Sequence, residues 1–175
     1  MAHTTRPLLV AATAATAVGT VLPVATGTAA ATATTEEHCV VHVLGIEESG
    51  EYLTDAPVCY PTLEEALADS GPPAGGAGTA GRSSSSVLSS VTLGTHFANS
   101  NRGGSSISIS GTACDGGYTN LSAAWVNRIS STQNNCSNTR FFDGVDKSGS
   151  QEATNLATVN LGALNDASDS ILYAS

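Results

Sequence analysis

Positively charged residues are scarce in this chain of 175 residues. It has six Lys and Arg against fifteen Asp and Glu, which gives a net charge of −9 at pH 7. Nine of the acidic residues lie between positions 36 and 69, so the negative charge is concentrated there. Binding to nucleic acid depends on a basic patch that attracts phosphates. The composition therefore argues against a nucleic-acid-binding protein and is that of an acidic, soluble chain.

The sequence also lacks the short motifs of common catalytic chemistries, including GxSxG, HExxH, SxxK and a glycine-rich phosphate loop. His96 could act as a general base, but a single histidine on an expected strand is far more often structural or solvent-facing. Glu64 and Glu65 are better explained by helix capping than as the opposed carboxylates of a glycosidase. We therefore expect a protein without enzymatic activity.

Long apolar runs are absent outside the first 33 residues. There, Arg6 precedes a stretch at 8–24 that is mostly apolar or Thr, and the small residues at 31–33 follow. This order is typical of a secretory signal peptide. A membrane anchor is the weaker alternative, because Thr, Gly and Pro interrupt a run that is already short for a bilayer. We expect residues 1–33 to be removed on export, leaving a secreted chain without membrane contact.

Cysteine is sparse but even in number, with Cys39, Cys59, Cys114 and Cys136. Four cysteines in an exported chain predict two disulfides. Three pairings are possible, and the layout favours Cys39–Cys59 and Cys114–Cys136. Each would close a loop of about twenty residues, worth about 3 kcal/mol in the chain-entropy model. A zinc site is the competing interpretation, which the absence of a CxxC pair and of histidine ligand spacing disfavours.

Residues 34–69 have the signals of a small element with two strands and a helix. The segment 39–46 is rich in β-branched residues, and 56–60 is a second strand candidate. Thr62 and Glu65 form a capping box that predicts a short helix after it. Fewer than forty residues cannot build a self-sufficient core, so a disulfide or packing on the following domain must support this element.

Residues 91–175 contain many short β-like segments and no convincing helical periodicity. Ser alternates with Ile107 and Ile109, which is the period-two pattern of a half-buried strand. Gly, Asn and Ser clusters separate such segments at intervals of roughly ten residues, which favours a sandwich of Greek keys. The predicted fold class is all-β, joined to the N-terminal element through a flexible Gly/Ser/Pro linker at 70–90. The other strand candidates are 92–97, 138–142 and 170–173.

Two stretches of this half repeat one pattern, which indicates a supersecondary unit used twice. We call 97–131 the first repeat and 142–170 the second repeat. Each has an aromatic residue, a glycine seven residues later and a closing loop that runs from Asn or Asp to Ser. The positions are Phe97, Gly104 and 127–131 in the first repeat, and Phe142, Gly149 and 165–170 in the second. The aromatic and the glycine recur after 45 residues, and the closing serines, Ser131 and Ser170, after 39.

The segments 97–104 and 142–149 resemble the first hairpin of a βγ-crystallin Greek key. The closing loops resemble the calcium loop of that family, which has two Asn/Asp residues, two variable ones, then Ser/Thr and Ser. Val126 stands here at the first Asn/Asp position, and Asp169 stands at the Ser/Thr position. The resemblance covers about half the chain, 91–173, and implies two Greek keys in one sandwich. Secreted bacterial proteins of this kind include crystallin-like peptidase inhibitors.

Calcium is the candidate ligand of these loops. Ca²⁺ takes six to eight hard oxygens from carboxylates, amide or main-chain carbonyls, hydroxyls and water. The loops offer Asn127 and Ser130 in the first repeat, and Asn165, Asp166 and Asp169 in the second. Only the second loop carries carboxylates, so we expect weak binding, with a dissociation constant of about 10⁻⁵–10⁻³ M. The alternative is that these residues only cap turns by bonding their own backbone.

Two functions from different classes remain open. The first is a secreted, monomeric module that binds calcium for stability or as a switch. The second is a protein-binding module whose partner is a secreted protease or another extracellular protein, and its inhibitor form rests on family analogy. A rigid exposed loop would make that contact, either at 114–118 or at 133–138. Asp166→Ala separates the two, because it should abolish a calcium effect and leave loop-based inhibition unchanged.

Overall fold

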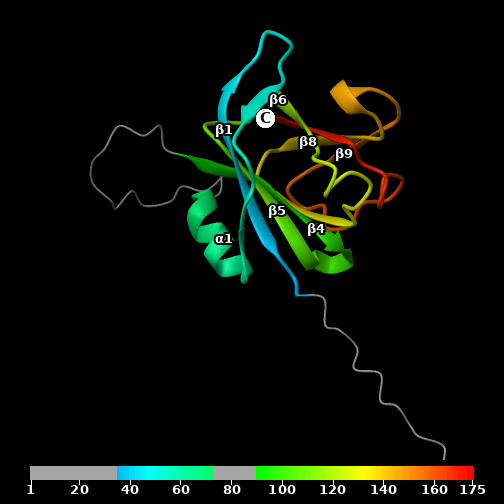
Figure 1. Ribbon diagram of the computed structural model, residues 1–175. Coiled ribbons are helices and arrows are strands. Elements are labelled where there is room, and N and C mark those ends of the chain that lie inside the picture. Colours follow the sequence, from blue (N-terminus) through cyan, green and yellow to red (C-terminus); the bar gives the residue numbers. More distant parts are fainter. Residues whose placement is uncertain (1–34, 73–89) are drawn as a thin grey trace, which may run out of the picture. The chain divides into compact units, whose positions relative to one another are not determined.

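The structure of residues 35–72 and 90–175, a computed structural model, is predominantly β, as the predicted fold class requires (Figure 1). In these residues the chain forms two β-sheets, one α-helix and two 3₁₀ turns. Residues 34–175 belong to one compact unit. The predicted signal peptide and most of the predicted linker lie outside the described residues. In the described part of the chain, no helix is long and apolar enough to cross a membrane.

The larger sheet has six strands, in the order β2-β1-β5-β4-β7, and β3 also pairs with β1. These strands are β1 (His38–Ile46), β2 (Tyr52–Thr54), β3 (Val58–Tyr60), β4 (Val91–Asn99), β5 (Gly103–Gly111) and β7 (Ser131–Asn134). The smaller sheet has four strands, in the order β6-β10-β8-β9. They are β6 (Asp115–Asn120), β8 (Asn138–Phe142), β9 (Gln151–Thr154) and β10 (Ser170–Ala174).

Residues 34–69, predicted as an element of their own, contribute to the larger sheet. β1 pairs with β5 in parallel, with Cys39 opposite Ile107 and Val41 opposite Ile109. Val40 and Val41 are buried. A segment of this size has too little apolar surface for a separate core, so its strand is stabilised by joining a sheet that already has one. The N-terminal segment and the two repeats therefore share one structure.

Helix α1 (Leu63–Ser70) follows the predicted capping box. Thr62 Oγ1 accepts a hydrogen bond from the Glu65 amide at 3.3 Å, and the helix ends before Gly71, whose φ of 85° only glycine adopts easily. The helix contacts β1 and β5. Ser70 Oγ lies 2.8 Å from Thr92 Oγ1 on β4, so the helix is also tied to the sheet by buried hydroxyls.

β5 shows how the two faces of the larger sheet differ. Ile107 and Ile109 enter the hydrophobic core together with Leu93, Phe141 and Ile171, as the period-two pattern predicts. The serines that alternate with them are also fully buried, because this strand is covered on both faces. These serines are Ser106, Ser108 and Ser110.

The two repeats exchange main-chain segments, one of which is a strand. β6 belongs to the first repeat, but it pairs with β10 at the end of the second. In return, the second repeat bonds to the first around β7, where the Thr132 amide donates to the Val159 carbonyl at 2.7 Å and the Leu161 amide to the Ser130 carbonyl at 3.0 Å. Each sheet is therefore completed by residues from the other repeat.

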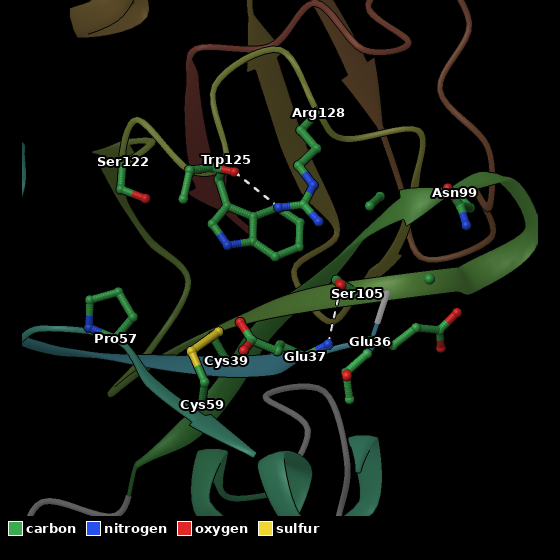
Figure 2. A pocket seen from close by; sticks show the side chains of 14 residues that line it. Glu36, Glu37, Cys39, Pro57, Cys59, Asn99, Ser105, Ser122, Trp125 and Arg128 are labelled. Carbon is green, nitrogen blue, oxygen red and sulfur yellow. Dashed lines mark hydrogen bonds between the residues drawn. A yellow bond between two sulfur atoms is a disulfide. The ribbon is translucent and has the colours of Figure 1, made fainter. Parts of the chain in front are cut away.

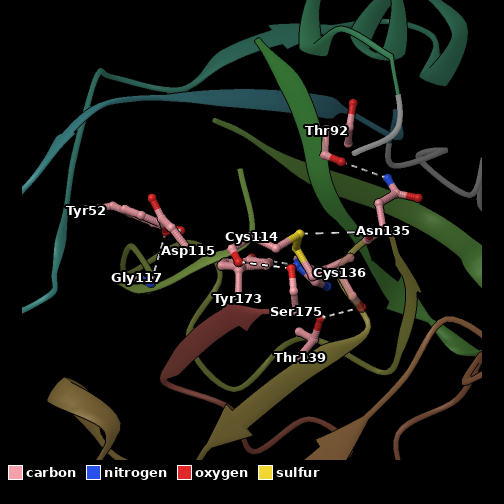
Figure 3. The surroundings of a disulfide bond; sticks show 11 residues. Tyr52, Thr92, Cys114, Asp115, Gly117, Asn135, Cys136, Thr139, Tyr173 and Ser175 are labelled. Atoms are coloured by element: carbon pink, nitrogen blue, oxygen red, sulfur yellow. Dashed lines mark hydrogen bonds between the residues drawn. A yellow bond between two sulfur atoms is a disulfide. The ribbon is translucent and has the colours of Figure 1, made fainter. Parts of the chain in front are cut away.

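The cysteines pair as the layout favours. Cys39–Cys59 joins directly opposite residues of β1 and β3. Cys114–Cys136 joins the residue before β6 to the turn after β7, and the Cys136 side chain is buried (Figure 3). Each bridge thus ties together segments that are about twenty residues apart in sequence.

Candidate functional site

The hairpins of the two repeats have the same backbone. Asn101 and Arg102 in turn η1 (Ser100–Arg102) have φ of 58° and 62°, and Asp146 and Lys147 in turn η2 (Val145–Lys147) have 56° and 59°. Positive φ is uncommon outside glycine, and here it recurs at positions 45 residues apart. The hairpin therefore folds back by the same left-handed pair in both repeats.

An asparagine from the opposite repeat fastens each hairpin. The Asn101 amide donates to Asn160 Oδ1 at 2.7 Å, and Asn160 Nδ2 donates to Asn101 Oδ1 at 2.9 Å. In the other hairpin, the Asp146 amide donates to Asn120 Oδ1 and Asn120 Nδ2 donates to Asp146 Oδ1, both at 2.8 Å. These reciprocal bonds hold the tight turns that precede the candidate loops.

The closing serines of the loops are structural. Ser131 Oγ accepts from the Arg102 amide at 2.8 Å and donates to the Asn99 carbonyl. Ser170 Oγ accepts from the Lys147 amide at 3.2 Å and donates to the Gly144 carbonyl at 2.7 Å. Both serines are fully buried, so they fix each loop to the hairpin of its own repeat.

The two candidate loops lie against each other. The Asp166 amide donates to the Ile129 carbonyl at 2.9 Å, and the Asn127 amide donates to the Ser168 carbonyl at 3.0 Å. Asn127 and Asp166 are both left-handed, with φ of 55° and 53°. This reciprocal pairing brings the second Asn/Asp position of each loop beside the Ser/Thr position of the other.

The first composite site consists of oxygens around Ser130. Its Oγ lies 2.6 Å from Asp166 Oδ1 and 3.0 Å from the carbonyl oxygen of Ala98. Ser130 is buried, whereas Asp166 is exposed. A hydroxyl, a carboxylate and a main-chain carbonyl, all hard oxygens, therefore converge at one point reachable from solvent.

The second composite site is the counterpart of the first, with Asp169 in the place of Ser130. The Asp169 amide donates to the Phe142 carbonyl at 2.8 Å, as the Ser130 amide donates to the Phe97 carbonyl at 2.9 Å. Asp169 Oδ1 is buried and has no hydrogen-bond partner. Within 35–72 and 90–175 it is the only buried side-chain oxygen or nitrogen in that condition. A buried carboxylate oxygen without a partner is costly, and a cation would remove that cost.

The pairing changes how charge is distributed between the sites. Counted along the sequence, both carboxylates belong to the second loop. In the structure, Asp166 contacts Ser130 of the first loop. Asp169 does not, and it directly follows Ser168, whose carbonyl accepts a hydrogen bond from the Asn127 amide. Each composite site therefore has one carboxylate. Asn165 is exposed beside the first site, where its Nδ2 donates to Asp166 Oδ2 at 3.1 Å.

Sequence reasoning missed the main-chain oxygen of the first site. The Ala98 carbonyl comes from β4, about thirty residues before Ser130 in sequence. The residue at the equivalent place in the second repeat is Asp143, 45 residues later. Both residues directly follow the repeated aromatic, and this shared place in the repeat is the signal in the sequence that could locate such a main-chain oxygen.

A cleft of about 520 Å³ adjoins the first site (Figure 2). Ala98, Trp125 and Arg128 line one part of it, and Glu37 and the Cys39–Cys59 bridge line another. The Arg128 guanidinium lies 5.0 Å from the centre of the Trp125 ring and donates to the Ala124 carbonyl at 3.3 Å. Trp125 is buried, so it anchors its loop, and the cation of Arg128 is held over the ring.

His96 is enclosed in the core. Its Nε2 lies 2.8 Å from Tyr173 Oη and its Nδ1 2.9 Å from Thr132 Oγ1. Burial lowers the pKa of His96 from 6.5 to about 3, because the charged ring cannot be solvated there. The edge-to-face contact with Phe141, at 5.3 Å between ring centres, completes its surroundings. These contacts give His96 a structural role.

No protein family, no curated protein and no solved structure matches this chain.

Proposed function

We propose that this chain is a secreted, non-enzymatic βγ-crystallin-like module that binds calcium at the two composite sites. The observation that carries the proposal is the partnerless Oδ1 of Asp169. It lies where the first site has Ser130 Oγ, beside a loop that supplies further oxygens. Calcium fits this set, because carboxylate, hydroxyl, amide and carbonyl oxygens are the ligands that it prefers.

Three features support the crystallin-like part of the proposal. The hairpins repeat the same left-handed pair, the closing serines make the same bonds, and the two repeats exchange main-chain segments. Two Greek keys with such an exchange would form one sandwich. The two disulfides support an extracellular location, because they persist in oxidising compartments.

Calcium would join the two repeats. The ligands of the first site come from both loops, Ser130 from one and Asp166 from the other. A bound cation would therefore add a cross-link that the unfolded chain does not have. With one carboxylate at each site, binding is weak, with a dissociation constant of about 10⁻⁵–10⁻³ M.

The second site is the tighter one. In the first site, Ser130 Oγ already donates to Asp166, and that hydrogen bond must be given up when the oxygens turn to a cation. In the second site, Asp169 Oδ1 makes no hydrogen bond that a cation would have to break. The site that costs less to rearrange binds more strongly, because only the surplus appears as affinity.

Thermal unfolding of residues 34–175 with calcium and with chelator tests the proposal. At a hundred times its dissociation constant, calcium adds about 2.7 kcal/mol and raises Tm by several degrees. Asp169→Ala should remove most of this shift, and it should raise Tm in chelator because an unpaired buried oxygen is gone. Asp166→Ala should remove the contribution of the first site. Glu48→Ala, which removes an exposed charge outside the loops, is the control.

Two results would contradict the proposal. One is the absence of a calcium-dependent shift in the unmodified protein. The other is a shift that persists in the Asp166→Ala, Asp169→Ala double variant, which would place the cation elsewhere. Either result would mean that the loops form turns and do not bind calcium.

A peptidase inhibitor or other protein-binding module is the second candidate. It is favoured by the turn at 112–114, where Thr112 and Ala113 are exposed and the Cys114–Cys136 bridge fixes the base (Figure 3). Of the loop predicted at 114–118, the residues from Asp115 onward belong to β6, and only Asp115 and Gly116 of these are exposed. Tyr52 Oη donates to Asp115 Oδ1 at 2.6 Å, which restrains the turn further. A rigid exposed turn is what a substrate-like inhibitor presents. Asp166→Ala distinguishes this candidate, because it would leave inhibition of a secreted protease unchanged.

A further inference from the structure

The β1–β2 hairpin carries exposed apolar side chains that the proposed function does not use. Leu44 is 72% exposed and Ile46 is 50% exposed. Both line a cleft of about 520 Å³, together with Val43 and Tyr52. A volume of this size holds one or two large side chains of a partner. We call it the hairpin cleft.

The hairpin cleft is preformed. At the tip, the Glu47 amide donates to the Glu51 carbonyl at 2.8 Å and the Gly50 amide to the Glu47 carbonyl at 2.9 Å. The Tyr118 amide of β6 then donates to the Gly50 carbonyl at 3.0 Å, which fixes the tip to the body (Figure 1). A partner would not have to order this hairpin, which reduces the entropic cost of binding.

The charge around the cleft is negative. Asp55 and Asp115 line it, and Glu47 and Glu48 are exposed at the hairpin tip. Among the residues that the structure describes, those lining the cleft include no Lys or Arg. Both aspartates use Oδ1 for their hydrogen bonds, to the His42 amide and to Tyr52 Oη, and their Oδ2 atoms have no partner in the described part of the chain. These oxygens are available to a cation.

This charge distinguishes between the occupants of an apolar cleft. A second copy would bring a chain of net charge −9 against the same acidic rim, and an anionic membrane surface would also be repelled. A polypeptide with Lys or Arg beside apolar side chains complements both the cleft and its rim. We therefore propose that the hairpin cleft is a docking site for a cationic polypeptide segment.

The contact is independent of calcium. The residues of the cleft come from β1, β2, the end of β5, the start of β6 and positions 55, 90 and 112 next to these strands, and none is part of either composite site. In the complex, an apolar side chain of the partner packs between Leu44, Ile46 and Tyr52. Its neighbouring Lys or Arg side chains reach Asp55 and Asp115. Affinity comes from the apolar anchor, and the acidic rim selects the sign of the partner's charge.

Fluorescence anisotropy with two labelled peptides tests this docking site. One peptide has the sequence Lys-Lys-Leu-Leu-Lys-Lys, and the other has Glu in place of every Lys. The protein should bind the Lys peptide at least tenfold more tightly, and raising the salt from about 50 to about 500 mM should weaken that binding several-fold.

Two variants and their controls locate the contact. Leu44→Ser with Ile46→Ser should weaken binding of the Lys peptide at least tenfold, whereas Leu156→Ser with Val145→Ser, also at exposed positions, should not. Glu47→Lys with Glu48→Lys should weaken it several-fold, and Glu36→Lys with Glu37→Lys should have less effect. Unchanged Tm values establish that the variants are folded.

Three outcomes would overturn the proposal. Equal binding of the two peptides would remove the charge argument, and equal binding by the Leu44→Ser, Ile46→Ser variant would place the contact elsewhere. Self-association of the unmodified protein in sedimentation, lost in that variant, would make a second copy the occupant.

Discussion

The two repeats are alike where they support the backbone and unlike where their loops meet. Ser131 and Ser170 make equivalent bonds to their hairpins, and Asn160 and Asn120 fasten equivalent turns. At the loop contact, however, one repeat presents a hydroxyl and the other a carboxylate. The shared bonds are those that the fold requires. The position where the repeats differ, Ser130 in one and Asp169 in the other, is not needed for the backbone and can bind a ligand. There the second repeat has the buried oxygen without a partner.

A second inequality lies in the core. His96 precedes the aromatic of the first repeat, and its counterpart 45 residues later is Phe141. The two rings meet edge to face. At this position the first repeat has a titratable imidazole and the second has a phenyl ring. Only the first repeat therefore has a group here whose protonation makes stability depend on pH.

The largest effect expected from disturbing the shared bonds comes from the closing serines. Ser131→Ala and Ser170→Ala each remove two hydrogen bonds and leave part-buried main-chain groups unsatisfied. We expect each to lower the free energy of unfolding by about 2–3 kcal/mol. If the repeats are equivalent, the two losses will agree within about 0.5 kcal/mol.

Urea unfolding measures these losses, with Ser137→Ala as an exposed control that should have almost no effect. A large loss in one repeat and a negligible loss in the other would contradict the equivalence of the two hairpins.

The next effect is the acid sensitivity that His96 introduces. Burial lowers the folded-state pKa of His96 from 6.5 to about 3. Between these two pH values, the imidazole is protonated in the unfolded chain and neutral in the folded chain. The contribution to stability is complete above pH 6.5 and declines by up to about 1.4 kcal/mol per pH unit below it. By pH 5 the loss should reach about 2 kcal/mol.

Unfolding of His96→Phe, which copies the second repeat, is the comparison for this prediction. Its stability should depend less on pH between 6.5 and 5 than that of the unmodified protein. An identical pH dependence in the two proteins would show that other groups take up the proton.

The smallest effect concerns the asparagines that fasten the turns. Asn160→Ala should cost about 1 kcal/mol, because its two bonds lie at an exposed turn. Asn120→Ala should cost slightly more, because Asn120 Nδ2 also donates to Glu51 Oε1 at 2.9 Å. Chemical unfolding of both variants resolves the order, and a greater loss in Asn160→Ala would contradict it.

The sequence predicts local structure well in this protein. The strand at 138–142 coincides with β8, and Ile107 and Ile109 are buried on β5 as their alternation indicates. The hydrogen bond between Thr62 and the Glu65 amide also forms as expected. These features depend on residues a few positions apart, so a short window contains their cause.

Contacts between distant residues were not predictable in the same way. The parallel pairing of Cys39 with Ile107 depends on packing that no local pattern encodes. The contact of Ser130 with Asp166 depends on how the two loops meet, so both carboxylates were assigned to one loop. β2 has only three residues, and no pattern in the sequence marks it as a strand.

The exchange of main-chain segments between the repeats has a consequence for synthesis of the chain on the ribosome. The first repeat begins at Phe97, yet its sheet is completed by main-chain bonds from Val159 and Leu161. A ribosome must therefore add some sixty residues after Phe97 before either half can close. Until then the nascent chain lacks the main-chain bonds that complete the sheet of the first repeat.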